Sequence, residues 1–496
     1  MEHSTSPFRR SIGYLHERPD RNKKFRVIVA SVYGLVAFFL PSFIRLSGDG
    51  ATKFRQKRLG VSSLDGLRGI AAVAVMNYHI LYAYLPAVFY GYGLPQAAAE
   101  QCARAEDREN HNLWLHQLPL LRLLYTGTWP ISVFFVISGF SLSYRTHWES
   151  YHTDGGVANG TMAMASSLLR RPIRLYGPPI IASMITMIAI YLGAYEPGRE
   201  VSSNPHLIPV FQELHHRRFN TLGGQVLDWC HETWKMLNIF WWGDLYNKYD
   251  IHLWTIPVEF RCSLAVFLVL PAYITVRPWM RRFIMSILVI YVYTLDRWDV
   301  SLFFSGLLMA DTSISLEASI DSSVSFSNFR LKLFLAARMT MLGFSLLLLS
   351  APDFCMGDTP GFILLSRMVP HSDPAPFRFL PNLGGLLLVA LLAHAPSSDP
   401  VISAVLRSSI AQYFGRISYS IYIVHGPLIH TVGYATFPFF WQLTGMEETW
   451  RYVTGLVSAY LVVVAIVIWV ADVFWRAVDK PCLRSAKSLQ RYLVIT

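Results

Sequence analysis

The residues best suited to chemistry are an arginine and a histidine that share one apolar stretch. Arg68 lies in the segment Leu64–Gly69, and His79 follows it eleven residues later. Eleven residues are close to three helical turns, so the two side chains project about 20° apart on one face and about 16 Å apart along the axis. An ionisable group in an apolar helix is costly and often functional. His79 is therefore either a general base or a core histidine bonded to a neighbouring helix, and Arg68 on the same face favours a function.

A carboxylate lies in a second apolar helix, which we expect to begin within the segment His252–Phe260. Pro257 suits the first turn of a helix, because proline lacks the N–H that this turn leaves unpaired, and Glu259 follows within the apolar part. A buried carboxylate needs a partner. That partner is either an imidazole from another helix or the side chain of a lysine or arginine, and the sequence leaves both open.

A dense cationic group lies where a cytoplasmic loop is expected to meet a helix. It consists of Arg170, Arg171 and Arg174. A guanidinium fork binds phosphate oxygens through two parallel hydrogen bonds. The three arginines are therefore either a topology anchor at the membrane surface or a site for the anionic end of a nucleotide cofactor.

A polar stripe follows later in the chain. Ser418, Tyr422 and His425 recur at helical spacing within the segment Gly415–His425, so they share one helix face. The stripe is either a substrate path or a set of hydrogen bonds between helices. The dipeptide Ser138–Gly139, by contrast, offers a small surface for close helix packing.

The composition is that of a membrane protein. The 496 residues are 53% hydrophobic and 15% charged, whereas a soluble domain carries about 25% charged residues, and the mean hydropathy is +0.35. The net charge of +11 does not indicate a nucleic-acid partner, because the basic residues lie at the ends of apolar runs and form no single stripe. We expect membrane lipid, and no nucleic acid, among the partners.

Apolar runs near the roughly 20 residues that cross a bilayer are spread along nearly the whole chain. We therefore predict an all-α polytopic transmembrane bundle of about ten spans, in one membrane-embedded domain over residues 62–481. The motif Asp479–Pro481 is expected to end the last span, and the polar stretch Ser313–Ser327 to form a loop. The predicted spans are Leu67–Tyr90, Thr126–Tyr144, Tyr176–Tyr195, Pro257–Val276, Phe283–Leu295, Val300–Ala310, Leu331–Ser350, Phe379–Ala395, Ile417–Phe437 and Val453–Trp475.

The distribution of charge predicts the orientation. Basic residues gather on one side of the threaded spans and acidic residues on the other, so both termini should be cytoplasmic, and we expect the endoplasmic reticulum membrane. Residues 1–61 would form an N-terminal tail and residues 482–496 a C-terminal one. The apolar run Val27–Ile44 has basic clusters on both sides and should be an interfacial or re-entrant segment. The sequon Asn159–Thr161 falls in a loop expected to be cytoplasmic, so a glycan there would overturn the orientation.

The five cysteines lack the paired spacing of a zinc or redox site, and we expect no metal. Cys102, Cys230 and Cys355 fall in loops expected to be lumenal, where a disulfide can form; the sequence does not say which two pair.

The longest of the loops expected to be lumenal, Glu196–Asp250, is rich in tryptophan and histidine. A loop of that length and composition should be a folded cap.

In this order, the motifs resemble the acyltransferase-3 family of integral membrane acyltransferases, particularly its fungal members. The resemblance covers roughly Ser62–Pro481, and the stretch Met1–Val61 matches only loosely. The family's paired arginine and histidine correspond to Arg68 and His79, its WT-x-x-x-E segment to Trp254, Thr255 and Glu259, its RR-x-x-R-L-Y segment to Arg170 through Tyr176, and its G-R-I-S-Y-S-x-Y segment to Gly415 through Tyr422.

The resemblance implies an enzyme that moves an acyl group, commonly acetyl, from cytosolic acyl-CoA to a hydroxyl acceptor. It implies a small lipophilic acceptor, such as a terpenoid or polyketide of fungal secondary metabolism, or alternatively a sugar. His79 would be the base and Glu259 its partner or an acceptor-binding group. The remaining roles would be CoA-phosphate binding by Arg68, Arg170, Arg171 and Arg174, and substrate binding by Trp254, Thr255, Ser418, Tyr422 and His425.

Two other classes of protein compete with this interpretation. A proton-coupled transporter also uses intramembrane histidine and glutamate, but such proteins often contain inverted repeats, and the sequence contains no recognisable repeat. A non-catalytic scaffold would not need His79. The acyl chain length, an acyl-enzyme intermediate and the oligomeric state are left open by the sequence.

Overall fold

The computed structural model describes residues 38–42, 59–108, 111–213, 215–319, 328–395 and 401–493. The chain divides into two compact units, Met1–Thr52 and Lys53–Thr496. Within the first unit the described part is limited to residues 38–42. The predicted interfacial segment Val27–Ile44 therefore lies mostly outside the described residues and stays a prediction.

The described part of the second unit is helical, without strands apart from one isolated bridge between Asn247 and Asp250, which confirms the all-α class. The α-helices are α3 (Leu59–Leu81), α4 (Gln96–Cys102), α5 (Thr128–His152), α6 (Gly156–Tyr191), α7 (Glu196–Ser202), α8 (Leu222–Leu237), α9 (Thr255–Thr275), α10 (Pro278–Thr294), α11 (Trp298–Ser319), α12 (Asn328–Leu349), α13 (Ile363–Ser366), α14 (Pro376–Ala393), α15 (Val401–Leu406), α16 (Ser409–Leu428), α17 (Tyr434–Thr444), α18 (Thr449–Phe474) and α19 (Lys480–Leu493). Short helical turns are η1 (Pro86–Val88), η2 (Ala105–Asp107), η3 (Leu115–Gln117), η4 (Leu121–Leu124), η5 (Ile251–Trp254), η6 (Met356–Asp358), η7 (Ile429–Gly433) and η8 (Trp475–Asp479).

A helix overlaps each of the ten predicted spans, because long apolar runs can satisfy their backbone groups in lipid as helices. Within the described residues, six helical stretches are long and apolar enough to cross a membrane: Gly156–Tyr191, Ile251–Thr275, Trp298–Leu316, Lys332–Leu349, Pro376–Ala393 and Thr449–Leu493. The chain is therefore a membrane protein, and the number of ten crossings stays a prediction.

Three predicted boundaries were wrong. The arginines Arg170, Arg171 and Arg174 and the sequon at Asn159 all lie within α6 instead of in a loop. The polar stretch predicted as a loop from Ser313 is helical as far as Ser319. In each case the helix continues past the end of its apolar run, because helical hydrogen bonding does not require apolar side chains.

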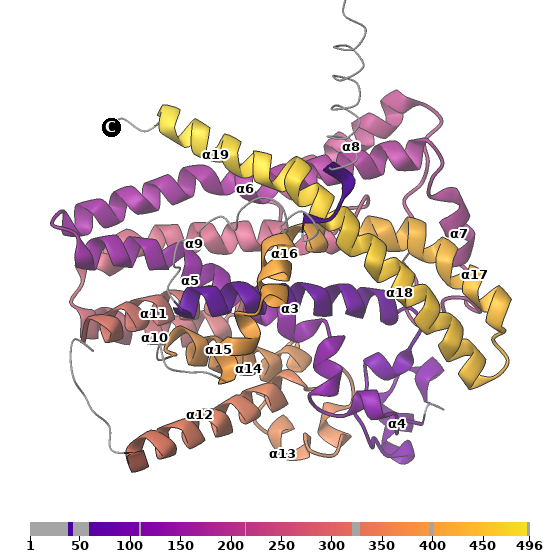
Figure 1. Ribbon diagram of the computed structural model, residues 1–496, viewed down its shortest axis with the longest axis horizontal. Helices are drawn as coiled ribbons and strands as arrows, with labels where there is room; N and C mark the ends of the chain where they lie inside the picture. Colours follow the sequence, from indigo (N-terminus) through magenta and orange to yellow (C-terminus); the bar gives the residue numbers. More distant parts are fainter. Residues whose placement is uncertain are drawn as a thin grey trace, which may run out of the picture. The chain divides into compact units, whose positions relative to one another are not determined.

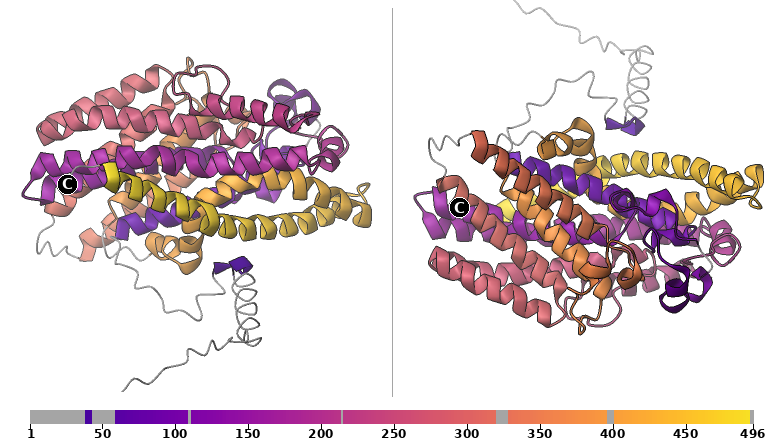
Figure 2. Two further views of the ribbon diagram at one scale, coloured as in Figure 1. Left: turned by 90° about the horizontal axis from the view of Figure 1, so that it is seen from above. Right: turned by 90° about the horizontal axis from the view of Figure 1, so that it is seen from below.

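The predicted stop at Asp479–Pro481 was also wrong. The chain passes from α18 through the π-helical turn η8 directly into α19, which carries Pro481 in its first turn. A proline is tolerated there because the first turn has unpaired N–H groups. The two helices form one continuous yellow run in Figure 1 and in the left view of Figure 2. The expected C-terminal tail is therefore helical from Lys480 to Leu493.

Glycines set how closely the central helices approach. Helix α3 packs against α16, and α5 packs against α11 (Figure 1). A Cβ atom on Gly69 of α3 would overlap the backbone of Gly415 on α16, and one on Gly139 of α5 would overlap the backbone of Phe303 on α11. The packing role predicted for Ser138–Gly139 is confirmed for Gly139, whereas Ser138 lines a cavity and donates a hydrogen bond to Glu259.

The predicted cap is folded. The stretch Glu196–Asp250 contains α7 and α8, and Thr221 caps the start of α8 by accepting a hydrogen bond from the Gly224 amide. A disulfide joins Cys102 to Cys355, while Cys230 is free and exposed. The pairing that the sequence left open is therefore settled.

Candidate active site

A cavity of about 560 Å³ lies where α3, α5, α6, α9 and α16 meet. It contains all but two of the residues predicted from the sequence to form the site. The exceptions, Arg170 and His425, lie outside its lining. The predicted residues that line it are Arg68, His79, Arg171, Arg174, Trp254, Thr255, Glu259, Ser418 and Tyr422.

One end of the cavity is cationic. Arg68 from α3 and Arg171 and Arg174 from α6 line it, and so does Arg416 from α16. Asp479 of η8 also lines this region and acts electrostatically on both Arg68 and Arg174. Sequence reasoning missed Arg416 as a site residue, although it lies within the G-R-I-S-Y-S motif.

Arg170 has a different role from the other arginines. Its Nε donates a hydrogen bond of 2.9 Å to the carbonyl oxygen of Ser166, one turn back on its own helix. The side chain therefore points away from the cavity lining that Arg171 and Arg174 share. Its predicted contact with the cofactor has no support in this geometry.

Of the two partners that the sequence left open for Glu259, the structure shows an arginine. Its Oε1 accepts hydrogen bonds from Arg171 Nη2 at 2.7 Å and from Ser138 Oγ at 2.9 Å. Arg171 Nε also donates to Ser263 Oγ at 3.0 Å. The partnership with His79 is thus not formed, and Glu259 orients the Arg171 guanidinium at the wall of the cavity.

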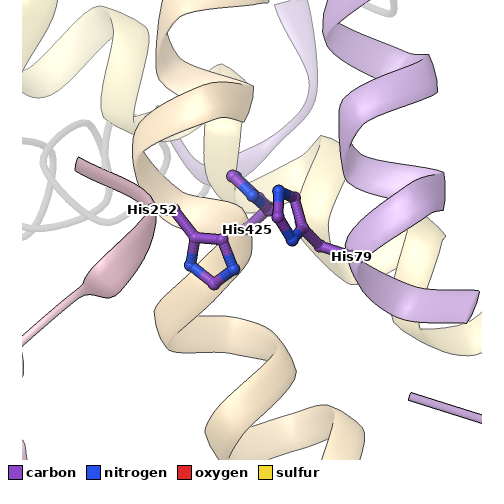
Figure 3. Close-up of side chains that lie close together, drawn as sticks. All are labelled: His79, His252 and His425. Carbon is purple, nitrogen blue, oxygen red and sulfur yellow. The ribbon is translucent and has the colours of Figure 1, made fainter. Parts of the chain in front are cut away.

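Three histidines from different elements meet further along the cavity (Figure 3). The ring centroid of His79 on α3 lies 4.2 Å from that of His252 on η5 and 5.2 Å from that of His425 on α16. The rings of His252 and His425 are 4.7 Å apart. His79 and His252 line the cavity, whereas His425 is fully buried behind them.

His252 was not among the predicted site residues, yet it makes the most charged contacts of the three. Its Nδ1 lies 2.9 Å from Asp250 Oδ1, and its Nε2 lies 3.2 Å from Glu213 Oε1. Glu213 also binds His430 Nε2. The available signal was local: Asp250 precedes His252 by two residues, the spacing at which an aspartate caps a turn by accepting the backbone N–H,.

The Glu213 carboxylate is ionised despite its burial. Burial raises the pKa of Glu213, but its ion pairs with His252 and His430 lower it further, so the pKa lies well below its usual range. An ionised carboxylate buried in protein requires hydrogen-bond donors around it. His252 and His430 supply those donors from two different elements.

The other two imidazoles differ from His252 in their contacts. His425 Nδ1 faces the carbonyl oxygen of Ile421 at 3.1 Å, so this nitrogen carries the proton and donates it. Among the described residues, His79 Nδ1 and His425 Nε2 have no hydrogen-bond partner, and His252 Nε2 has only its ion pair with Glu213 at 3.2 Å. His79 is thus the imidazole that faces the cavity and has no carboxylate bonded to its ring.

The three imidazoles could be considered as metal ligands, since each offers one nitrogen and these nitrogens lie within 4.8 Å of one another. Zinc needs lone pairs from neutral imidazoles. His252 has a carboxylate oxygen near each ring nitrogen, and these two carboxylates compete with a metal for the imidazole. The absence of a metal from this cluster stays a prediction.

Tyr422 and Thr255 hold His252 in place. The Tyr422 hydroxyl donates to the backbone carbonyl of His252, so the Thr255 hydroxyl, 2.6 Å away, donates to Tyr422. Their hydrogen bonds serve the histidine cluster and leave little capacity for substrate. Ser418 Oγ likewise donates to the carbonyl of Gly415.

The other end of the cavity is aromatic. Phe211, Tyr246, Trp254, Phe354 and Phe377 line it together with Asp353 and Arg378. Asp353 accepts a hydrogen bond of 2.6 Å from Thr128 Oγ1, and burial raises its pKa, an effect that Arg122 and the Thr128 hydroxyl oppose. The cavity thus offers an apolar chamber with one polar pair, separated from the arginines by the histidines.

The comparisons with known proteins agree with one another. A family model described as an acyltransferase domain, of the acyltransferase-3 type, matches residues 61–475. The chain is 29% identical to the O-acetyltransferase PaAT-1 of Phomopsis amygdali over 91% of this chain and 88% of that protein. It is 23% identical to the acyltransferase R4 of a Phoma species and 23% identical to the acyltransferase clz18 of Cochliobolus lunatus, in both cases over 86% of this chain and 95% of the relative. No solved structure matches.

Proposed function

The chain belongs to the acyltransferase-3 family and is an O-acyltransferase, and we propose that it moves an acyl group from acyl-CoA to a hydroxyl of a small lipophilic acceptor. The observation that carries the proposal is one cavity with four arginines at one end, mostly aromatic side chains at the other and His79 between them. Such a cavity suits one anionic and one apolar substrate that meet at a base.

The arginine end suits the phosphates of CoA. Arg68, Arg171 and Arg174 present guanidinium groups to one space, and guanidinium groups bind phosphate oxygens in pairs. Glu259 supports this role because its hydrogen bond fixes the position of the Arg171 guanidinium group. Because Arg68 and His79 lie about 16 Å apart along α3, a CoA bound at the arginines would extend its thioester toward the histidine.

His79 would act as the general base. An alcohol is a weak nucleophile until its proton is removed, and a positioned base accelerates such a step by about 10² to 10⁴. The acceptor O–H proton passes to His79 while the oxygen attacks the thioester carbonyl carbon. The tetrahedral intermediate then expels the CoA thiolate, which takes the proton from His79, leaving an ester and a free thiol.

The aromatic end would hold the acceptor. Its side chains offer apolar surface to a ring system, and Asp353 and Arg378 offer one polar contact each. This composition favours a terpenoid or polyketide alcohol of fungal secondary metabolism over a sugar, which would need many hydrogen bonds. The relatives include a fungal O-acetyltransferase, which supports acetyl as the transferred group.

The proposed orientation follows the two ends of the cavity. The arginine end lies toward the N-terminus of α3, which the charge distribution makes cytoplasmic, and cytosolic CoA would enter there. The Cys102–Cys355 disulfide supports a lumenal position for the opposite loops, since disulfides persist in oxidising compartments. We propose that both termini are cytoplasmic and that the membrane is the endoplasmic reticulum.

The test is transfer of labelled acetyl from acetyl-CoA to a panel of terpenoid, polyketide and sugar alcohols in microsomes. His79→Ala should lower kcat by about 10² to 10⁴. His216→Ala is the matched control, because His216 pairs with Asp228 and lies outside the main cavity. Wild-type transfer by His79→Ala would rule out the proposed base.

The acceptor itself can be found by comparing metabolites of cells with and without the gene. A compound that loses one acyl mass when the gene is removed would identify the product. A sugar-containing product would contradict the lipophilic acceptor but leave the acyl transfer intact.

A further inference from the structure

A chain of buried charged groups runs from the cavity toward the cap and has no part in the function proposed so far. It begins at His252, continues through Glu213 and ends at His430. Asp250 joins it at the other nitrogen of His252. His252, Glu213 and Asp250 are each at most 6% exposed.

The contacts of His252 determine its protonation. Both of its ring nitrogens face carboxylate oxygens, Asp250 Oδ1 at 2.9 Å and Glu213 Oε1 at 3.2 Å. An ionised carboxylate only accepts hydrogen bonds. Each ring nitrogen must therefore carry a proton, since a neutral imidazole would turn a lone pair toward one of the two anions. His252 is accordingly an imidazolium cation.

The backbone holds this cation in a single position. Asp250 Oδ1 also accepts the backbone N–H of His252 at 3.1 Å, and the Tyr422 hydroxyl donates to the His252 carbonyl. A Cβ atom on Gly426 would overlap both the His252 ring and the Asp250 carboxylate, so α16 lies directly against the pair. A group fixed from three sides suits a positioning role.

We infer that His252, held as an imidazolium between Asp250 and Glu213, keeps His79 in its neutral, proton-accepting form and drives the proton taken up by His79 onward to the departing thiolate. The inference rests on the proposed function, because it assigns His252 a role in the reaction of that same site. It makes His252 a positioning residue that acts through His79.

Burial already disfavours the charged form of His79, and repulsion from the His252 cation adds to this effect. The His79 and His252 rings are 4.2 Å apart, and two cations at that separation in a buried site are strongly unfavourable. The titratable groups around His79 are Tyr78 on its own helix, Tyr82 in the turn that follows, His252 on η5, His425 on α16, Glu213 on the cap and His430 on η7. His252 is the nearest charged group, so its effect on His79 exceeds the opposing effect of Glu213.

The proton balance of the reaction fits this arrangement. One proton leaves the acceptor oxygen and one proton is needed by the thiolate, so His79 must release what it takes up. While His79 holds that proton, two imidazolium rings lie side by side. Transfer to sulfur removes the repulsion, and the enzyme returns to its starting state with no net gain or loss of protons.

The pH dependence of kcat/KM in microsomes tests the inference, with rates normalised to folded protein. His252→Gln removes the cation, so His79 should be protonated more easily and the acidic limb of the profile should move upward by about one pH unit. His252→Lys restores a cation between the carboxylates, and its acidic limb should return toward that of the wild type. A His252→Gln enzyme that is slower but has an unshifted acidic limb would assign His252 a merely structural role.

A second measurement uses the wild-type protein, in case the variants do not fold. Diethyl pyrocarbonate modifies neutral imidazoles and should inactivate the enzyme by reacting with His79. The part of this inactivation that bound acyl-CoA prevents is assigned to His79. The rate of this inactivation should stay nearly constant between about pH 7 and about pH 6, where an ordinary histidine loses about two-thirds of its neutral form. A threefold fall would overturn the inference. Transfer retained by His79→Ala would instead contradict the proposed function itself.

Discussion

The arginines show how much a single side-chain direction decides. Arg170, Arg171 and Arg174 lie within five positions of one helix, yet only the last two line the cavity. Arg170 is bonded to the carbonyl of Ser166. Three arginines that look equivalent in the sequence thus have two different roles.

The first prediction separates these functions. Arg174→Ala should raise KM for acyl-CoA by a factor of about 10 to 100, because a hydrogen bond to a charged group contributes about 1.5 to 3 kcal/mol. Arg170→Ala, the matched control, should leave KM unchanged. Steady-state kinetics over a range of acyl-CoA concentrations measure both, and equal effects of the two substitutions would contradict the assignment.

The second prediction concerns Glu259. Glu259→Gln weakens the hold on Arg171 by removing the charge from a hydrogen bond of 2.7 Å, so KM for acyl-CoA should rise by about tenfold. The acidic limb of the pH profile should keep its position, because Glu259 is not bonded to His79. If that limb moves instead, Glu259 acts on the base, which is the other alternative that the sequence left open.

At the scale of elements, the approach of α3 to α16 sets the geometry of the site. Helix α3 carries Arg68 and His79, and α16 carries Tyr422 and His425. Gly69 and Gly415 let the two backbones touch. A wider separation of the two helices would move His79 away from His425, although neither residue would be changed.

The third prediction tests this contact. A Cβ at Gly415 would overlap the Asp65 backbone, so Gly415→Ala should destabilise the protein by about 1 to 3 kcal/mol through overpacking. Gly343→Ala on the exposed face of α12 meets nothing within 4 Å, so it should have no such cost. Thermal unfolding followed by size-exclusion chromatography in detergent compares the two, and equal melting temperatures would refute the close contact.

At the scale of the whole molecule, one covalent link joins two distant parts of the chain. Cys102 and Cys355 are 253 residues apart in sequence. The link lies beside the aromatic end of the cavity, since Cys355 directly follows Phe354, which lines it. It therefore stabilises the wall of the chamber in which we place the acceptor.

The fourth prediction follows from this link. Cys102→Ser should lower the free energy of unfolding by about 2 to 5 kcal/mol, and reduction of the wild type should have the same effect. Cys230→Ser should have none, because Cys230 is free and exposed. Melting temperatures with and without reductant provide the measurement. Labelling of Cys102 by a maleimide in the unreduced protein would contradict the disulfide.

The sequence by itself determined the features that arise within one segment. Apolar runs predicted the helices, because a helix in lipid satisfies its own backbone, and the spacing of Arg68 and His79 predicted a shared face, because both belong to α3. The ordered motifs indicated the family. Each of these depends on residues that are close in the chain.

Only the tertiary structure decided which side chains meet across segments. It paired Glu259 with Arg171, enclosed His252 between two carboxylates, turned Arg170 away from the cavity and joined Cys102 to Cys355. Hydropathy and helical spacing describe each helix separately. They carry no information on which helices are neighbours or how each helix is rotated, and those two properties set the partners of every charged group at the site.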